Sequence, residues 1–347
     1  MEELNKINEE GLEVLTKQDF VSDQEVKWCP GCGDYVVLAA VQSILPEIGK
    51  KKEDVVFVSG IGCSSRFPYY VNTYGFHGIH GRASAISSGV KIANPNLSVW
   101  QITGDGDSMA IGGNHFIHLI RRNIDINVIL LNNKIYGLTK GQASPTTPMG
   151  SSTKSSPEGS IEPPFRPGLL TVGAQGNFFA RVLDTNPKML REAITEAALH
   201  KGTSIVEVLQ NCVIFNNQVH SIVTDKANRD DNQLHLKHGE PMLFGANKEK
   251  GIRLNKDTLK LEQVVIGENG VSIDDILVHN AKNKDYTLQL MLIHMHPPKM
   301  PLALGVIRSV DAPEYNELLE KKMAETKAKS PFRSMNDLLF SGDIFEL

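Results

Sequence analysis

The stretch from Ser98 to Gln142, SVWQITGDGDSMAIGGNHFIHLIRRNIDINVILLNNKIYGLTKGQ, decides the fold. It opens with strand-forming residues, breaks at the GDGD turn of residues 104–107 and continues with apolar residues at helical spacing. A second apolar strand follows over Ile126–Leu131 and ends in two asparagines. This pattern predicts a strand–helix–strand unit with polar groups at the carboxyl ends of both strands, where open α/β sheets bind ligands.

Two of these polar side chains suit a metal ion. Asp105 follows the first strand and Asn133 follows the second. Mg²⁺ prefers such oxygen ligands and often shares them with the phosphates of a substrate. Gly104 and Gly106 allow the backbone to pass close to a phosphate, and a helix expected from about Ile111 would direct free N–H groups at it. A βαβ turn with no ligand is the alternative, and the matched strand ends favour a cofactor site.

Strands and helices keep alternating from residue 34 to residue 212. The pattern predicts strands at 54–61, 178–183 and 204–209, and helices at 34–45, 83–94 and 187–200. Such alternation predicts an α/β fold with a doubly wound parallel sheet. Residues 143–170 are rich in Ser, Thr, Pro and Gly, and because they directly follow the metal site we interpret them as an active-site loop.

The sequence divides into three parts. We expect a polar amino-terminal arm at 1–27, an α/β domain at 28–221 and a smaller carboxyl-terminal extension at 222–347 that serves as a cap or interface. In the extension we expect strands at Pro241–Phe244 and Tyr286–His294 and a helix at Ile273–Lys282. A short amphipathic helix is expected near the end.

Charge and hydropathy exclude several classes of protein. The net charge of −4 leaves no electrostatic footprint for nucleic acid. No apolar run approaches the length of a membrane span, and the polar start has no hydrophobic region of a signal peptide. We therefore expect a cytoplasmic protein that binds neither nucleic acid nor membrane.

The 347 residues include only four cysteines: Cys29, Cys32, Cys63 and Cys212. In a reducing cytoplasm a C-x-x-C pair indicates metal or redox chemistry rather than a disulfide. All four cysteines are expected at turns or strand ends, and in a doubly wound sheet such positions gather at one edge. Four thiolates serve a [4Fe–4S] cluster or a structural zinc ion. Burial of Cys63 and Cys212 as ordinary core residues is the third interpretation.

Two resemblances narrow these alternatives. Gly-Asp-Gly followed one helix and one strand later by Asn-Asn resembles the thiamine diphosphate signature. WCPGCG, GIGCSSR, HGIHGRA, GDGD, NNKIYGLTKGQASPTT and a late lone cysteine, in this order, resemble the β subunit of 2-oxoacid:ferredoxin oxidoreductases. The match is strong over residues 20–220 and weaker beyond. It implies a sheet of the thiamine-diphosphate-binding type.

The resemblance also implies the ligands. Mg²⁺ would be held by Asp105, Asn133 and the carbonyl of Ile135, and a [4Fe–4S] cluster by Cys29, Cys32, Cys63 and Cys212. Contacts with thiamine diphosphate would come from Ile61, Gly62, Cys63, Ser64, His80, Gly81, Arg82, Gly106, Asp107, Gly137, Leu138 and Thr139. In that family the α subunit carries the glutamate that activates the cofactor. We find no candidate for it here, so the chain alone should be inactive.

The implied reaction is the CoA-dependent oxidative decarboxylation of a 2-oxoacid to acyl-CoA and CO₂, with reduction of ferredoxin. Lys140, and less directly Arg66, would pair with the distal carboxylate of 2-oxoglutarate, a contact that pyruvate cannot make. Pyruvate or a branched-chain 2-oxoacid is the alternative substrate. A non-oxidative thiamine-dependent decarboxylase subunit with structural zinc, or an iron–sulfur scaffold without enzymatic activity, is the alternative of another class.

Overall fold

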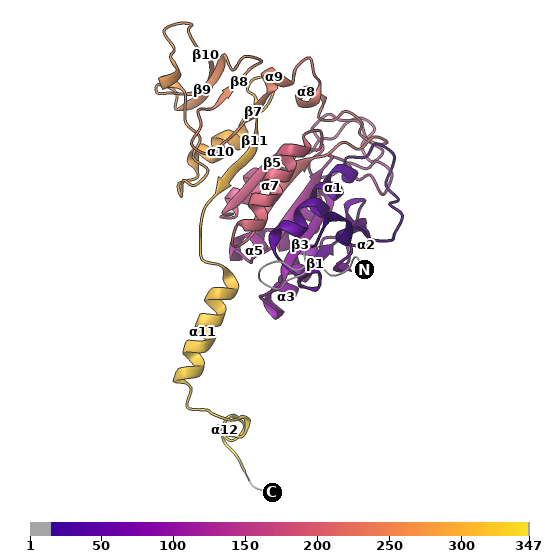
Figure 1. Ribbon diagram of the computed structural model, residues 1–347, viewed down its shortest axis with the longest axis vertical. Coiled ribbons are helices and arrows are strands. Elements are labelled where there is room, and N and C mark those ends of the chain that lie inside the picture. The colour runs from indigo at the N-terminus through magenta and orange to yellow at the C-terminus, as the bar shows by residue number, and fades with distance from the viewer. Residues whose placement is uncertain (1–14, 346–347) are drawn as a thin grey trace, which may run out of the picture.

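The computed structural model describes residues 15–345 of the chain, and an eight-stranded sheet forms its centre (Figure 1). The strands of this sheet are β1 Val55–Ser59, β2 Tyr74–His77, β3 Ser98–Gly104, β4 Asn127–Asn132, β5 Phe178–Leu183, β6 Ser204–Leu209, β7 Gln233–His235 and β11 Leu302–Ser309. They lie in the order β2-β1-β3-β4-β6-β5-β11-β7. Neighbours from β2 to β5 are parallel, so their carboxyl ends meet at one edge. The predicted α/β fold with a doubly wound parallel sheet is confirmed.

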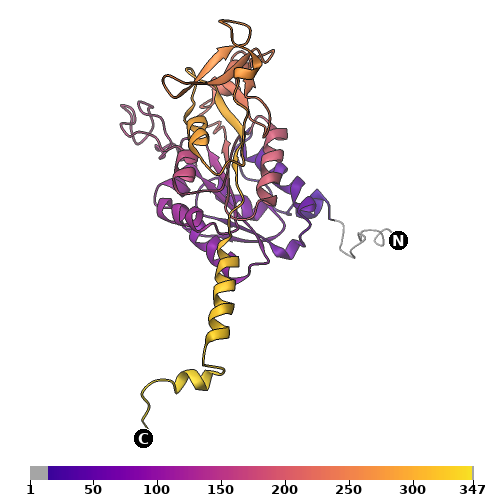
Figure 2. The same ribbon diagram turned by 90° about the vertical axis from the view of Figure 1, so that its left-hand side faces the viewer.

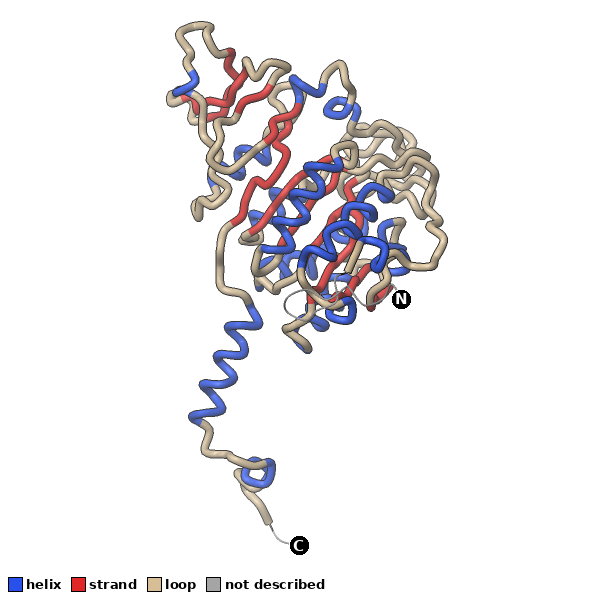
Figure 3. The backbone as a smooth tube through the Cα atoms, in the orientation of Figure 1, coloured by secondary structure: helices blue, strands red, loops and turns tan. Residues whose placement is uncertain are grey.

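Helices cover both faces of the sheet (Figure 3). The helices of the body are α1 Asp34–Ile44, α2 Phe67–Tyr70, α3 Ala83–Ala93, α4 Asp105–Met109, α5 Gly113–Arg122, α6 Pro167–Gly173, α7 Pro187–Leu199, α8 Ser221–Thr224, α9 Arg229–Asn232 and α10 Thr287–His294. One core cluster joins α1 and α7 to alternate strand residues, and a second joins α5, α6 and α10 to the residues between them. Strands β1, β5 and β6 are buried along their whole length, so neither of their faces is exposed to solvent.

The carboxyl-terminal part extends this sheet and adds a smaller one. Strand β11 pairs antiparallel with β5, and β7 pairs parallel with β11. The smaller antiparallel sheet contains β8 Leu243–Phe244, β9 Lys250–Asn255 and β10 Lys260–Val265. Residues beyond 222 therefore share the hydrophobic core of the α/β body, through side chains such as Leu234 and Ile307.

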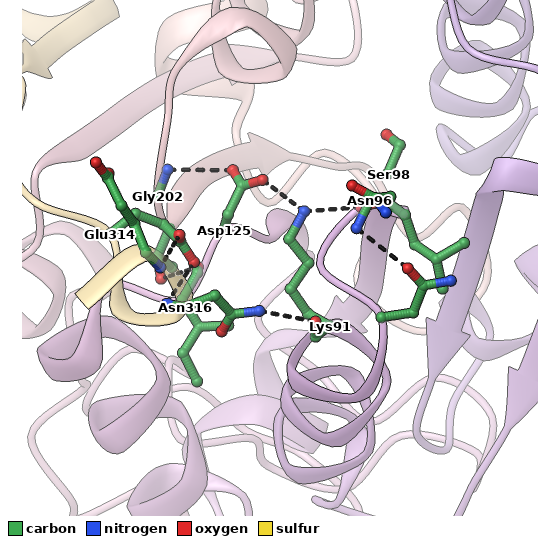
Figure 4. Close-up of polar contacts among 12 residues, drawn as sticks. Lys91, Asn96, Ser98, Asp125, Gly202, Glu314 and Asn316 are labelled. Carbon is green, nitrogen blue, oxygen red and sulfur yellow. Dashed lines mark hydrogen bonds and ion pairs between the residues drawn. The ribbon is translucent and has the colours of Figure 1, made fainter. Parts of the chain in front are cut away.

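The chain ends in an arm that projects from the body (Figure 2). It consists of α11 Tyr315–Lys329 and α12 Met335–Leu339. Its root is fixed by hydrogen bonds, since Nδ2 of Asn316 donates to the carbonyl of Lys91 at 2.8 Å (Figure 4). The buried Nζ of Lys91 lies 2.7 Å from Oδ2 of Asp125, which holds the neighbouring turn in place. The arm is thus attached at its first turn, and most of its other side chains are exposed.

Two expectations for the extension are wrong. Tyr286–His294 was expected as a strand and forms helix α10 instead, with Leu292 and Ile293 buried. A short apolar run fits either structure, and here packing against the second core cluster decides. Ile273–Lys282 contains only a single 3₁₀ turn, at Ile273–Asp275, rather than a helix. The expected strand at Pro241–Phe244 is reduced to β8, and the short helix near the end is confirmed as α12.

Of the expected amino-terminal arm, residues 1–14 lie outside the described residues. Within residues 15–345, every helix is too short or too polar to cross a lipid bilayer.

Candidate active site

A cavity of about 400 Å³ lies at the carboxyl ends of β1, β3 and β4. Most residues that the sequence predicts for the cofactor and its metal ion line this cavity. They are Ile61, Gly62, Cys63, Ser64, His80, Asp105, Gly106, Asp107, Asn133, Ile135, Gly137, Leu138 and Thr139. The parallel register explains the convergence, because Gly104 of β3 lies opposite Leu131 of β4 and the chain continues from both into the cavity wall. We name this space the cofactor cavity.

Asp105 is buried at the wall of the cofactor cavity. Its Oδ2 accepts hydrogen bonds from Oγ of Ser144 and Oγ1 of Thr146, both at 2.5 Å. Burial raises the pKa of Asp105 to about 6, and the hydroxyl donors oppose that shift. Oδ1 of Asn133 accepts from the backbone N–H of Ile135 at 3.2 Å, so the amide oxygen is held near the Ile135 peptide. A buried carboxylate, an amide oxygen and a carbonyl are a donor set that fits Mg²⁺.

Asp107 joins three segments of the cavity wall. Its Oδ1 accepts from the backbone N–H of Ile61 at 3.0 Å and of Gly81 at 2.8 Å, and lies 2.9 Å from Nδ1 of His80. Its Oδ2 accepts from Oγ1 of Thr103 at 3.0 Å. Both carboxylate oxygens therefore bind protein donors. Asp107 therefore holds these segments of the wall in place and orients the ring of His80.

Glycines bring the backbone close at two points of the wall. A Cβ placed on Gly106 would lie 2.3 Å from Cε1 of Tyr136, and the hydroxyl of Tyr136 donates to the carbonyl of Gly106 at 3.0 Å. Gly81 has a φ of +72°, and a Cβ there would lie 2.6 Å from the backbone nitrogen of Gly112. Side chains at these two positions would push the wall apart.

The helix that begins at the cavity differs from the expected one. The sequence predicts a helix N-terminus near Ile111, but α4 begins directly at Asp105, and α5 begins at Gly113. The backbone N–H groups nearest the cofactor cavity are therefore those of the first turn of α4, since Gly104, Asp105 and Gly106 line it. The short α4 was not recognisable because its glycine and two aspartates are weak helix formers.

The four cysteines lie close together beside the cofactor cavity. A Cβ placed on Gly137 would lie 3.5 Å from Sγ of Cys212 and 3.7 Å from Sγ of Cys63. Cys29 and Cys32 share one turn, in which the N–H of Cys32 donates to the carbonyl of Cys29 at 3.0 Å. Nε2 of Gln210 donates to Sγ of Cys32 at 3.2 Å. Of the four, Cys63 also lines the cofactor cavity.

Cys32 and Cys63 lie in an environment that opposes ionisation of their thiols. Burial raises the pKa of Cys63 to about 12, with further contributions from the charges of Asp34, Cys212 and Cys29. Burial and Asp34 raise the pKa of Cys32 in the same direction. Thiolates in such a place need a nearby positive charge, which bound metal atoms supply. Within residues 15–345, however, no three His, Cys, Asp or Glu side chains are grouped as ligands of a single metal ion.

Seven predicted residues do not line the cofactor cavity. Gly81 is bonded to the cavity residue Asp107, and Cys212 lies beside the cavity residue Gly137. Cys29 is exposed and shares a turn with Cys32. Nε of Arg66 donates to the hydroxyl of Tyr70 at 2.8 Å, which ties this exposed side chain to α2. Lys140 is exposed in the turn after Leu138, with a φ of +75°. Arg82 precedes α3, and its Nη1 is buried without a partner among residues 15–345.

Sequence reasoning missed several residues of the site. Asp34, Tyr136 and Gln142 line the cofactor cavity, and Ser144 and Thr146 hold Asp105. Asp34 is fully buried, and burial raises its pKa to about 7. Ser144 and Thr146 belong to the segment predicted as an active-site loop, but the sequence does not predict their hydrogen bonds to Asp105. A serine and a threonine in a loop rich in both carry no signal that selects them.

Comparison with known proteins agrees with the cofactor site inferred from the geometry. Residues 60–208 match the family model described as thiamine pyrophosphate enzyme, C-terminal TPP binding domain. The fold and its cavity therefore define a thiamine diphosphate-binding domain. The residues matched run from the glycine that precedes Ile61 to Val208 in β6, and they include the whole of the predicted magnesium set.

Longer matches specify the family. The chain is 45% identical over 315 residues to the 2-oxoglutarate oxidoreductase subunit KorB of Mycobacterium tuberculosis, which covers 90% of this chain and 83% of the relative. It is also 44% identical over 208 residues to 2-oxoacid:ferredoxin oxidoreductase 2, subunit beta, of Aeropyrum pernix. That match covers 60% of this chain and 66% of the relative. A solved 2-oxoglutarate:ferredoxin oxidoreductase from Magnetococcus marinus, with 2-oxoglutarate, coenzyme A and succinyl-CoA bound, superposes with a TM-score of 0.74. That match has 29% identity and covers 95% of this chain and 97% of the solved chain.

The chain belongs to the family of 2-oxoacid:ferredoxin oxidoreductase β subunits, and it is a subunit of an oxidoreductase. The family inferred from the motifs is confirmed.

Proposed function

We propose that this chain is the β subunit of a CoA-dependent oxidoreductase that converts 2-oxoglutarate to succinyl-CoA and CO₂ and passes two electrons to ferredoxin. Relatives named for 2-oxoglutarate, and the solved relative with 2-oxoglutarate and coenzyme A bound, support this substrate. The observation that carries the proposal is that Cys63 and the predicted magnesium ligands line one cavity.

The residues of the cofactor cavity suit thiamine diphosphate and Mg²⁺. Asp105, Asn133 and the carbonyl of Ile135 would hold the ion, and Gly106 lines the cavity without a side chain. When bound, thiamine diphosphate supplies the electron sink that lets a 2-oxoacid lose CO₂. The chain itself keeps the wall in shape through Asp107 and holds His80 toward it.

The cysteine group suits a [4Fe–4S] cluster better than a zinc ion. Four zinc ligands must meet around a single point, at about 2.3 Å for sulfur, whereas each thiolate of the cluster binds a different iron atom. Relatives named as ferredoxin oxidoreductases support the cluster, because electron transfer to ferredoxin has a use for iron–sulfur chemistry and none for zinc. Cys29, Cys32, Cys63 and Cys212 would be its ligands, and it would take up electrons beside the cofactor cavity.

A second subunit is needed to complete the site. Within residues 15–345, the carboxylates that line the cofactor cavity are all aspartates, and no glutamate is among them. An α subunit would supply the glutamate that activates the cofactor. Ferredoxin and coenzyme A are the other partners of the proposed reaction.

Lys140 is the residue that would select 2-oxoglutarate. It lies in the turn that begins at the cavity residue Gly137, whose carbonyl accepts from the N–H of Lys140 at 3.0 Å. From this rim its ammonium group would pair with the distal carboxylate of the substrate. Arg66 is the second candidate, and its Nε already donates to the hydroxyl of Tyr70.

The test is co-expression of the chain with a matching α subunit, followed by an anaerobic assay of ferredoxin reduction. We expect reduction that requires both coenzyme A and a 2-oxoacid, with 2-oxoglutarate the best substrate and the chain alone inactive. A preference for pyruvate or a branched-chain 2-oxoacid would contradict the substrate assignment. Release of CO₂ without reduction of ferredoxin would instead favour a non-oxidative decarboxylase.

A further inference from the structure

A second cavity, of about 330 Å³, lies behind the cofactor cavity at the ends of β4, β5 and β6. Successive residues from the end of β4 line the two cavities in turn: Asn133 and Ile135 line the cofactor cavity, whereas Asn132 and Lys134 line the second one. Its size is that of a pocket for a small molecule. We name it the basic cavity.

Positive charge dominates the basic cavity. Lys134, Arg166 and Arg181 line it, and Glu207 is the only carboxylate among the described residues that do so. His220 and His296 also line it. Burial lowers the pKa of both imidazoles, to about 3 for His220, so neither adds charge at neutral pH. The lining therefore has three cations and one anion.

Arg181 has binding capacity that the described residues leave unused. It lies on the fully buried strand β5, and 5% of it is exposed. Its Nε donates to Oε2 of Glu207 at 2.7 Å, but its Nη1 is buried and has no hydrogen-bond partner within residues 15–345. Leaving a buried N–H of a charged group without an acceptor is destabilising, so a buried guanidinium is normally paired throughout.

The carboxylate of Glu207 does not satisfy that donor in this structure. Its Oε1 already accepts from Nδ2 of Asn132 at 2.8 Å, while its Oε2 binds Nε of Arg181. The amino group of Lys134 forms no ion pair within residues 15–345. Burial lowers its pKa, and the charge of Glu207 opposes that shift. Phe165, Ile222 and Ile293 give the remaining wall an apolar character.

We propose that the basic cavity binds a small organic anion, whose carboxylate or phosphate group pairs with Arg181 and Lys134 and whose apolar part contacts Phe165 and Ile222. A guanidinium with a free Nη1 and a neighbouring ammonium suit an oxyanion, because charge-assisted hydrogen bonds are the strongest that side chains make. The site is separate from the cofactor cavity, with Thr146 between Asp105 and Asn132.

The test is calorimetric titration of the full-length chain with inorganic phosphate and, separately, with propionate, at constant ionic strength. Thiamine diphosphate and Mg²⁺ are kept at saturation so that the cofactor cavity cannot bind the probe. We expect one saturable site for at least one of the two probes. No saturable binding of either probe would overturn the proposal.

Two variants locate the site. Arg181→Met combined with Glu207→Gln removes the cation without leaving a charged partner, and the introduced amide keeps an oxygen for Asn132; binding should weaken about tenfold or more. Ile222→Trp fills the mouth from a position that is 38% exposed, and it should block binding with all charges intact. Lys226→Gln changes an exposed lysine that lines another cavity and should have no effect.

The remaining outcomes are also decisive. Equal binding by the wild-type chain and both basic-cavity variants would place the anion elsewhere and overturn the proposal. Loss of phosphate and propionate binding when the α subunit is added would assign Arg181 to a carboxylate of that subunit, and would overturn the small-ligand assignment. Neither result depends on decarboxylase activity, so the proposed function can fail or hold independently.

Discussion

Nδ1 of His80 lies 2.9 Å from Oδ1 of Asp107, a residue 27 positions away in the sequence. The same oxygen accepts the N–H groups of Ile61 and Gly81, so one buried carboxylate fixes the loop after β1 and the loop before α3. Asp107 therefore ties two loops of the wall of the cofactor cavity together.

Replacing Asp107 by alanine should lower the free energy of unfolding by about 3 kcal/mol, because buried donors that lose their acceptor each cost about 1–3 kcal/mol. Asp107→Asn keeps the Oδ1 acceptor and should cost less than half as much. Denaturant unfolding of both variants measures the difference. Equal losses would mean that the charge, rather than the acceptor, stabilises the wall.

Asp105 should make the stability of the cofactor-free chain depend on pH. Its pKa is raised from 3.8 to about 6 in the folded state, so its contribution is complete below 3.8 and is lost as the pH rises toward 6. The loss amounts to roughly 3 kcal/mol. Asp105→Asn should remove this dependence and stabilise the cofactor-free chain at neutral pH, while abolishing the stabilisation by Mg²⁺ with thiamine diphosphate. Melting curves over this pH range, with and without the ligands, test both effects.

Gly106→Ala should destabilise the chain by about 1–3 kcal/mol, because the added methyl group overlaps the ring of Tyr136. Gly89→Ala is the matched control. Gly89 lies inside α3 with open space around it, so alanine should stabilise the helix by up to about 1 kcal/mol. A lower melting temperature for Gly106→Ala and a higher one for Gly89→Ala would support the close packing of Tyr136 against Gly106. An unchanged melting temperature for Gly106→Ala would contradict it.

Lys140→Ala should raise KM for 2-oxoglutarate about tenfold in the assembled enzyme and leave KM for pyruvate nearly unchanged, since the latter has no distal carboxylate. Lys188→Ala, an exposed lysine on α7, controls for a general loss of positive charge. Steady-state kinetics with both substrates distinguish the possibilities. Equal effects on the two substrates would show that Lys140 has no part in selecting between them.

Much of the site was predictable because residues at the carboxyl ends of parallel strands must meet. Asp105 and Asn133 each follow an apolar strand, and neighbouring strands bring them to one cavity without further information. The motifs around Cys29 and Cys63 needed the family resemblance, because spacing alone also fits zinc. Ser144 and Thr146 were out of reach, because their hydrogen bonds to Asp105 depend on the path of an irregular loop.

The carboxyl-terminal part was less predictable for a different reason. Helix α11 was missed because Tyr315–Lys329 has no periodic apolar face, and nearly all of it is exposed. Strand β11 adds to the sheet in the antiparallel direction, which alternation of strands and helices does not anticipate. Helix α10 was mistaken for a strand because its eight residues, Thr287–His294, are too short for a clear period.

The central claim is that the four cysteines beside the cofactor cavity hold a [4Fe–4S] cluster. The most direct measurement is the iron, acid-labile sulfide and zinc content of the full-length chain purified without oxygen, together with its visible absorption. We predict about four iron and four sulfide per chain and a broad visible band, all lost on replacement of Cys212 or Cys63 by alanine. A colourless chain with stoichiometric zinc and no iron would contradict the account.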